Sequence, residues 1–219
     1  MQTVDYLSKD IKALSSLDKV SVVQQLFKKL TFTHLPIVEK GYLLGLVSEE
    51  DIQTIDSIDK PLADFEYLYQ VFFTFEKANW LEVLKSFALN DATILPVLDE
   101  SKRYIGYYEL TDILQVFNST PFLSENGSIL VISKDIQEYS FREIAQIVES
   151  NDARLLGAFI SKIQKDTVEI TVKLSDHDLN TTIQTFRRYG YSILTDFQVD
   201  EYLNTLKERS DYLQKYLNI

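Results

Sequence analysis

Two aspartates, Asp51 and Asp112, stand at corresponding places in two similar stretches of the chain. The first stretch runs Gly45-Leu46-Val47-Ser48-Glu49-Glu50-Asp51-Ile52, and the second runs Gly106-Tyr107-Tyr108-Glu109-Leu110-Thr111-Asp112-Ile113. A carboxylate accepts hydrogen bonds from ligand hydroxyls, and a helix N-terminus favours an anion. Acidic residues are equally favoured in the first turn of a helix that binds nothing. The residue types therefore indicate either a binding cleft or two capped helices.

The stretch that precedes each motif is repeated as well. Thr33-His34-Leu35-Pro36-Ile37-Val38 returns as Thr93-Ile94-Leu95-Pro96-Val97-Leu98, with the prolines 60 residues apart. A repeat of this length indicates an architecture of two similar units in tandem. One unit of this size cannot bury both of its apolar faces, so the two copies should pack together.

Each copy predicts the order helix, strand, turn, strand, short helix. The strands are expected over 35–38 and 42–47, then over 94–98 and 104–108, and the last helices near Ser48 and Glu109. The apolar face of the first helix is Val20, Val23, Leu26, Phe27 and Leu30, with Asp18 as its N-cap, and that of the second is Leu81, Leu84, Phe87 and Ala88.

The Leu-Pro strand and the later Gly-x-x-x-x-x-Asp-Ile resemble a pair of CBS domains, the tandem called a Bateman module. The segment from Gly45 to Asp51 fits the family's Gly-x-x-(Ser/Thr)-x-x-Asp, and the resemblance covers roughly residues 1–120. It places repeat 1 at 1–60 and repeat 2 at 61–120. The fold class that it implies is α+β.

The resemblance implies a nucleotide cleft in each repeat. In the first, Asp51 would take the ribose hydroxyls of an adenine ligand and Ser48 would face the phosphate. Thr33, His34 and Pro36 belong to the same candidate site, although the Leu-Pro strand is also explained as core. Burial as an ordinary polar residue explains His34 equally well.

The second candidate site comprises Asp112, Thr93 and Pro96. Glu109 puts a negative charge where the family places a neutral hydroxyl, so a neutral adenosine-like ligand, or none, fits this cleft better. Lys102 and Arg103, in the preceding turn, are the candidates for attracting an anion.

Composition excludes several function classes. The 219 residues carry a formal net charge of −11, which disfavours a nucleic-acid partner, and contain no cysteine. No signal peptide and no apolar run long enough to span a bilayer is seen, so we expect a cytoplasmic protein without a membrane partner. Two distant histidines and no catalytic motif indicate that the chain is not an enzyme and holds no metal.

The second half predicts a different domain. After a linker at 121–127, residues 128–199 read as β-α-β-β-α-β, the ferredoxin-like order, with strands at 129–133, 153–163, 167–174 and 191–197. The helices are expected over 140–150, with Ser140 and Glu143 as a capping box, and over 177–189, ended by Gly190. Residues 200–219 form an amphipathic C-terminal helix that packs on its own domain or on a second copy.

By its element order this domain resembles an ACT domain, as in acetoin-utilisation-type CBS/ACT regulatory proteins. The loop at 134–140 lacks the glycine of amino-acid-binding ACT domains, which favours a dimerising role.

Two functions stay open. In the first, the CBS pair is a non-catalytic sensor that binds AMP, ADP, ATP or S-adenosylmethionine and relays the binding by a conformational change to an unknown regulated protein. In the second, the clefts are empty and the chain is a homodimeric scaffold. A homodimer is expected in both cases, because CBS pairs generally associate.

Overall fold

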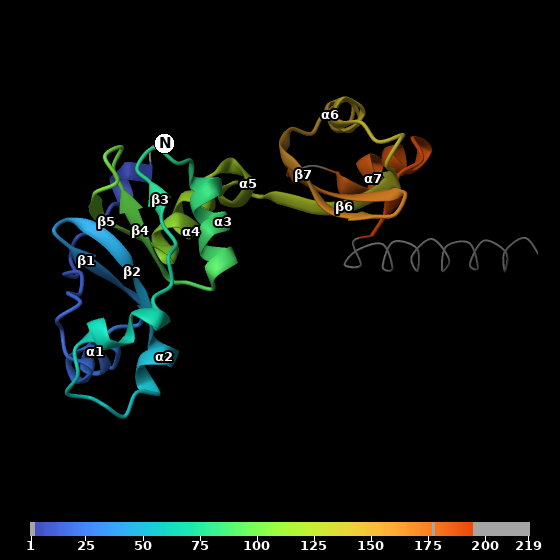
Figure 1. Cartoon of the computed structure of the whole chain (residues 1–219). Helices are drawn as coiled ribbons and strands as arrows, with labels where there is room; N and C mark the ends of the chain where they lie inside the picture. The colour runs from blue at the N-terminus through green and yellow to red at the C-terminus, as the bar shows by residue number, and fades with distance from the viewer. Residues whose placement is uncertain (1–2, 177, 195–219) are drawn as a thin grey trace, which may run out of the picture. The chain divides into compact units, whose positions relative to one another are not determined.

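The computed structural model describes residues 3–176 and 178–194, with the side chains of residues 3 and 4 left aside. The chain divides into two compact units, Met1–Ser119 and Thr120–Ile219 (Figure 1). The predictions for His177, for the end of the last strand and for the C-terminal helix at 200–219 lie outside the described residues.

The first unit repeats one order of elements, as the sequence predicts. The first copy comprises α1 (Val20–Phe27), β1 (His34–Glu39), β2 (Tyr42–Ser48) and α2 (Glu49–Gln53). The second copy comprises α3 (Trp80–Asn90), β4 (Ile94–Leu98), β5 (Tyr104–Glu109) and α4 (Leu110–Asn118). Three short elements were not predicted, namely the 3₁₀ helices η1 (Thr3–Tyr6) and η2 (Leu62–Leu68) and the strand β3 (Thr74–Phe75).

The two strand pairs have the same register. β1 and β2 are antiparallel with Pro36 opposite Leu46, and β4 and β5 are antiparallel with Pro96 opposite Tyr107. Both pairs have an irregularity at the corresponding place, after Ile37 and after Val97. β3 adds to β4 in parallel, so the second sheet has the order β3-β4-β5. Sequence repetition is thus reproduced in backbone geometry.

A separate apolar core fills each repeat. The first contains α1, β1 and β2 residues such as Val23, Phe27 and Ile37, and the second contains Phe87, Ile94 and Tyr108. Burial of this much apolar surface is the main force that holds the helices on the strands.

Two details of the predicted helices are wrong. The N-cap of α1 is Lys19, and the carboxylate of Asp18 instead accepts a bond of 2.8 Å from the backbone N–H of Ser15. On α3, Leu81 is 58% exposed and Ala88 is also exposed. Its buried residues are Val83 and Phe87, because the helix turns a different stripe toward the strands than the spacing suggested.

A glycine in each repeat lets another segment approach the second strand closely. A Cβ on Gly45 would lie 3.1 Å from the carbonyl oxygen of Gln70, and one on Gly106 would lie 2.6 Å from that of Ser8. Gln70 and Ser8 each exchange two backbone hydrogen bonds with the residue after the glycine, which is Leu46 or Tyr107. The glycines therefore position two segments that come from outside the repeated motifs.

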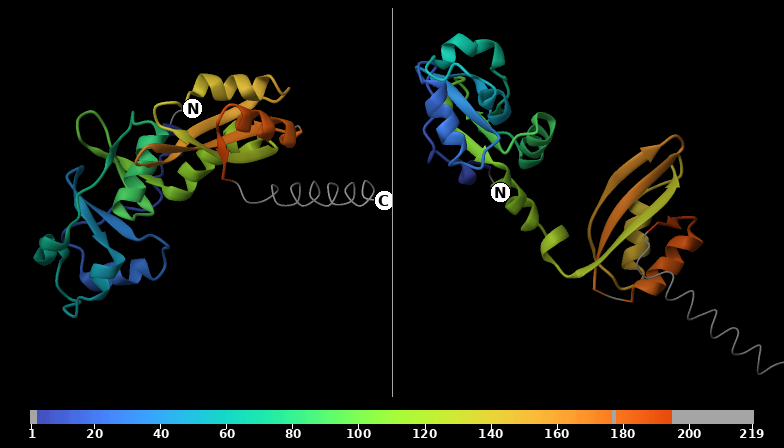
Figure 2. Two further views of the ribbon diagram at one scale, coloured as in Figure 1. Left: turned by 90° about the vertical axis from the view of Figure 1, so that its right-hand side faces the viewer. Right: turned by 90° about the horizontal axis from the view of Figure 1, so that it is seen from below.

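The second unit has the predicted ferredoxin-like order. Its elements are β6 (Gly127–Asp135), α6 (Phe141–Glu149), β7 (Leu155–Gln164), β8 (Thr167–Ser175), α7 (Leu179–Arg188) and β9 (Ser192–Ile193). The sheet order is β7-β8-β6-β9 with antiparallel neighbours, and both helices lie on one side of it (Figure 2). The apolar positions predicted for β8 are confirmed, since Val168, Ile170, Val172 and Leu174 are fully buried. Lys173, predicted on the opposite face, is also buried, and its ammonium donates to the carbonyl oxygen of Gly127 at 3.3 Å.

Some boundaries of this unit differ from the prediction. Residues 121–124, expected in a linker, form the short helix α5 (Pro121–Ser124). Ser140 caps α6 as predicted, but the carboxylate of Glu143 bonds the ammonium of Lys134 at 2.8 Å instead of closing a capping box. Gly190, at φ +82°, follows α7 in the left-handed conformation that the prediction required.

Among the helices of the described chain, none is long and apolar enough to span a bilayer.

Candidate functional site

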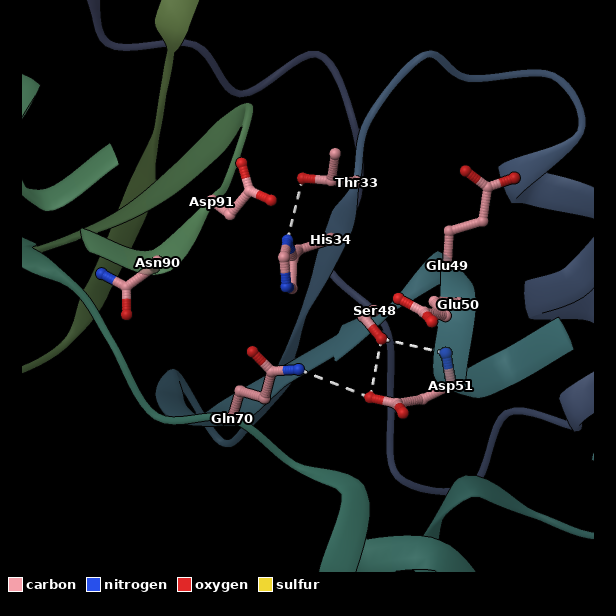
Figure 3. Close-up of a pocket in the computed structure, with 9 residues that line it drawn as sticks. All are labelled: Thr33, His34, Ser48, Glu49, Glu50, Asp51, Gln70, Asn90 and Asp91. Carbon is pink, nitrogen blue, oxygen red and sulfur yellow. Dashed lines mark hydrogen bonds between the residues drawn. The ribbon is translucent and has the colours of Figure 1, made fainter. Parts of the chain in front are cut away.

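A cavity of about 480 Å³ opens in the first repeat, where β1 begins and β2 passes into α2 (Figure 3). Nine residues line it: Thr33, His34, Ser48, Glu49, Glu50, Asp51, Gln70, Asn90 and Asp91. Four of the eight residues predicted as ligand-binding are among them, namely Thr33, His34, Ser48 and Asp51. They meet because the antiparallel register sets His34 directly opposite Ser48, and α2 starts at the next residue.

Ser48 and Asp51 are tied to each other. The hydroxyl of Ser48 accepts the backbone N–H of Asp51 at 3.0 Å and donates to Oδ2 of that carboxylate at 2.7 Å. The side-chain amide of Gln70 donates to the same oxygen at 3.4 Å. The capping bond fixes the start of α2, and the two side-chain bonds fix the orientation of the carboxylate.

His34 is 6% exposed and hydrogen-bonds a neighbouring threonine. Its Nδ1 is 2.8 Å from the hydroxyl of Thr33, and Gln70 lines the same cavity. The ring also meets the edge of Phe72 at a centroid distance of 5.3 Å. Burial lowers the pKa of His34, although Gln70, Asp51 and Asp91 act in the opposite direction. The imidazole is therefore neutral at pH 7.

The lining is acidic. It contains the carboxylates of Glu49, Glu50, Asp51 and Asp91, and none of its nine residues is Lys or Arg. Asp91 follows α3 in the left-handed conformation, at φ 47°, so the second repeat contributes one of these charges. A cleft with this charge repels phosphate groups and attracts cations.

The prolines do not line the cavity. Pro36 and Pro96 are buried within β1 and β4, and the carbonyl oxygen of Pro36 accepts the N–H of Leu14 at 2.8 Å. Both fit the structural explanation of the Leu-Pro strands better than a ligand contact.

The second repeat has a different set of residues at the equivalent positions. Ile94 pairs with Glu109 as His34 pairs with Ser48, so an apolar side chain replaces the imidazole. Glu109 precedes α4 without making a side-chain capping bond. Burial raises the pKa of Glu109, and the nearby carboxylates of Asp112 and Asp10 raise it further. Asp112 is half-buried in the first turn of α4.

Lys102 and Arg103 do not serve the second cleft. Both residues precede Tyr104, the first residue of β5, whereas Glu109 is its last residue. At the rise per residue of an extended chain, the two ends of this strand are about 16 Å apart. Arg103 instead lies over the ring of Tyr42 at 5.8 Å. The idea that these two residues attract an anion there is wrong, because they are at the opposite end of β5.

Five residues of the cavity were missed by the sequence reasoning as site residues: Glu49, Glu50, Gln70, Asn90 and Asp91. Glu49 and Glu50 stand inside the motif and were treated as spacers. Gly45 carried a usable signal, because a glycine within a strand often marks a close backbone approach. Nothing in the sequence identified Gln70 as the approaching residue.

Residues 4–56 match the family model described as the CBS domain. The matched segment contains β1, β2 and α2, and so six of the nine residues that line the cavity. The second repeat has the same element order and strand register, so the fold is α+β, a CBS pair followed along the chain by a ferredoxin-like unit.

Three similar proteins illustrate the range of relatives. An uncharacterized protein of Methanocaldococcus jannaschii is 28% identical over 124 residues, which are 56% of this chain and 47% of that protein, so the match spans about half of the relative's length. A CBS domain pair/ACT domain protein of Thermotoga maritima is 21% identical, with a TM-score of 0.47 over 53% of this chain and 96% of that chain. CBSX2 in complex with AMP is 17% identical, with a TM-score of 0.46 over 53% of this chain and 95% of that chain.

Proposed function

We propose that this chain is a non-catalytic regulatory protein whose first cleft binds an adenosyl ligand. The observation that carries the proposal is the shared cavity of Thr33, His34, Ser48 and Asp51, formed by the segment that matches the CBS family. Ser48 and Asp51 occupy the hydroxyl and carboxylate positions of that family's motif.

Asp51 retains capacity for a ribose. An ionised carboxylate has about four lone-pair sites. The Oδ2 atom accepts from Ser48 and Gln70, so two of these sites are in use among the described residues. The remaining two suit the two vicinal hydroxyls of a ribose ring.

The charge of the cleft selects among adenosyl ligands. The hydroxyl of Ser48 donates its one proton to Asp51, and His34 is neutral at pH 7. The lining contains four carboxylates. A phosphate here would meet repulsion and little hydrogen-bond donation. An adenosyl ligand with a cationic group, of which S-adenosylmethionine is the example, gains attraction from the same charges. We therefore rank S-adenosylmethionine above AMP, ADP and ATP.

The second cleft is proposed to stay empty. Ile94 and Glu109 stand where the first repeat has His34 and Ser48, which removes a polar ring and a neutral hydroxyl. This observation favours the scaffold role for the second repeat. With a ligand only in the first cleft, the proposed sensor has one ligand site per chain.

Relay of the signal is proposed to follow a population shift. A ligand favours one packing of the two repeats by no more than its difference in affinity for the alternative packings. We further propose that the second unit has an ACT-like role and that the chain is similar to acetoin-utilisation-type regulatory proteins. The chain is proposed to form a homodimer and to act on a regulated protein that is unknown.

A thermal-shift comparison of S-adenosylmethionine, adenosine, AMP and ATP tests the proposed function. A ligand that binds only the native state raises the melting temperature with concentration. The expected order of stabilisation is S-adenosylmethionine, then adenosine, then AMP, with ATP last. An order led by ATP would contradict the charge argument, and no shift with any of them at millimolar concentration would favour the empty scaffold.

A further inference from the structure

The two repeats meet through a reciprocal pair of threonines. The backbone N–H of Thr33 donates to the hydroxyl of Thr93 at 3.0 Å, and the backbone N–H of Thr93 donates to the hydroxyl of Thr33 at 3.0 Å. The two hydroxyl oxygens are 3.4 Å apart. These residues stand directly before β1 and β4, so the pair joins equivalent points of the two repeats.

The same threonines hold the starts of the two last helices. The carbonyl oxygen of Thr33 accepts the N–H of Glu49, the first residue of α2, at 2.8 Å. The carbonyl oxygen of Thr93 accepts the N–H of Leu110, the first residue of α4, at 3.0 Å. A small displacement of either threonine therefore changes the start of a helix at each candidate cleft.

From Thr33 a chain of polar side chains continues into the first cleft. Nδ1 of His34 is 2.8 Å from the hydroxyl of Thr33, so Nε2 is on the other side of a ring that lines the same cavity as Gln70. The Gln70 amide N–H donates to Asp51 at 3.4 Å (Figure 3). A neutral imidazole has one donor and one acceptor. The hydroxyl of Thr33 accepts the N–H of Thr93 and has its own proton to donate to Nδ1, which assigns the ring proton to Nε2.

We propose that this chain of five side chains, Asp51, Gln70, His34, Thr33 and Thr93, is the route by which the first cleft acts on the second repeat. Gln70, His34, Thr33 and Thr93 are positioning residues in it. The ligand that would use the route rests on the proposed function, whereas the connection itself is present in the free protein.

The physical step is a change of partner at Asp51. A ligand hydroxyl that donates to this carboxylate competes with the long bond of 3.4 Å from Gln70. Release of Gln70 frees the Nε2 side of His34, and the ring and the Thr33 hydroxyl readjust together. The threonine pair passes the displacement to the bond between Leu110 and Thr93. Since energetic coupling is reciprocal, a change at the threonine pair must also be felt in the cleft.

NMR of the ligand-free protein tests the connection in both directions. Gln70→Leu breaks the chain at the cleft, and we expect shifted amide resonances of Thr93 and Leu110 and a rise of about threefold in hydrogen exchange at Leu110, less than the full loss of one hydrogen bond. Glu50→Gln alters another residue of the same cavity that is outside the chain, so it should leave both amides unchanged.

In the reverse direction, Thr93→Val removes a hydroxyl that is outside the cavity. The expected result is a changed tautomer ratio of His34 in ¹⁵N imidazole spectra, which are simple because the chain has only 2 histidines. Unchanged Leu110 exchange in Gln70→Leu, or an unchanged His34 ring in Thr93→Val, would overturn the proposal.

Addition of S-adenosylmethionine separates the two proposals. If it binds and Leu110 exchange responds in the wild type but not in Thr93→Val, the route is supported. If it binds without any response at Leu110, the route is overturned and the binding function stands. If it does not bind, the ligand-free results alone decide the route.

Discussion

Gly45→Ala is expected to weaken the attachment of Gln70 to the first cleft. The new methyl group would lie 3.0 Å from Cβ of Tyr69 and 3.1 Å from the carbonyl oxygen of Gln70, so the segment that carries both must move away. That movement loosens the two backbone bonds between Leu46 and Gln70, which measure 2.8 and 2.9 Å.

The magnitude follows from the bonds that are loosened. Two hydrogen bonds contribute about 2 kcal/mol together. The loss of glycine's freedom in the unfolded chain returns about 0.4–1 kcal/mol. The free energy of unfolding of the first unit should fall by about 1–1.5 kcal/mol, which corresponds to roughly 4–6 °C in Tm for a unit of this size.

Gly41→Ala is the matched control. Gly41 has φ +83°, and no described atom lies within 4 Å of the place that a Cβ would take, so its substitution strains the backbone without displacing a neighbour. The strain costs about 1–2 kcal/mol, and the same return from the unfolded chain reduces the expected loss to about 1 kcal/mol. Calorimetry measures both losses, and NMR titration of His34 distinguishes the variants.

The pKa of His34 gives the decisive reading. Gln70 is the strongest of the influences that raise this pKa against burial. Displacement of Gln70 should therefore lower the pKa of His34 further in Gly45→Ala and leave it unchanged in Gly41→Ala. Equal values in the two variants would refute the role given to Gly45.

Three further predictions concern single side chains. His34 has a lower pKa in the folded than in the unfolded protein, so its contribution to stability is complete above about pH 6.5 and is lost as the pH falls through the folded pKa. His34→Gln should flatten that part of the plot of unfolding free energy against pH, measured by urea unfolding. An unchanged slope would contradict the burial of a neutral ring. Asn79 caps α3 by accepting from Leu81 and Glu82, so Asn79→Ala should cost about 1 kcal/mol in denaturant unfolding, with Ser86→Ala as the control on the same helix. Phe186 is fully buried in the second unit, and Phe186→Ala should destabilise that unit by about 3–5 kcal/mol; a loss below about 1 kcal/mol would mean that the site collapses around the cavity.

The strands and the main motif were predictable because their signals are local. The alternation of Val168, Ile170, Val172 and Leu174 reports a sheet with one buried face, and the structure buries all four. The meeting of His34 with Ser48 and Asp51 followed from a repeated motif whose family fold brings them together. Their meeting depends only on the pairing of two adjacent strands and on the helix that follows the second one, and a short stretch of sequence specifies both.

The features that the sequence did not reveal depend on contacts between segments that are distant along the chain. Gln70 reaches the cleft from a connection between the repeats, and its own sequence carries no pattern for that placement. Lys102 and Arg103 looked close to Glu109 in the sequence, yet an extended strand separates them from it. The stripe on α3 was misjudged because Val83, between the chosen positions, faces the core.

Calorimetric titration with S-adenosylmethionine of the wild type, Asp51→Ala and Asp112→Ala tests the central claim most directly. Both variants remove an aspartate from the first turn of a last helix, but only Asp51 lines the cavity. The account predicts one site per chain, at least a tenfold loss of affinity (about 1.4 kcal/mol) in Asp51→Ala, and wild-type affinity in Asp112→Ala. Equal affinity in all three proteins, or a loss confined to Asp112→Ala, would contradict it.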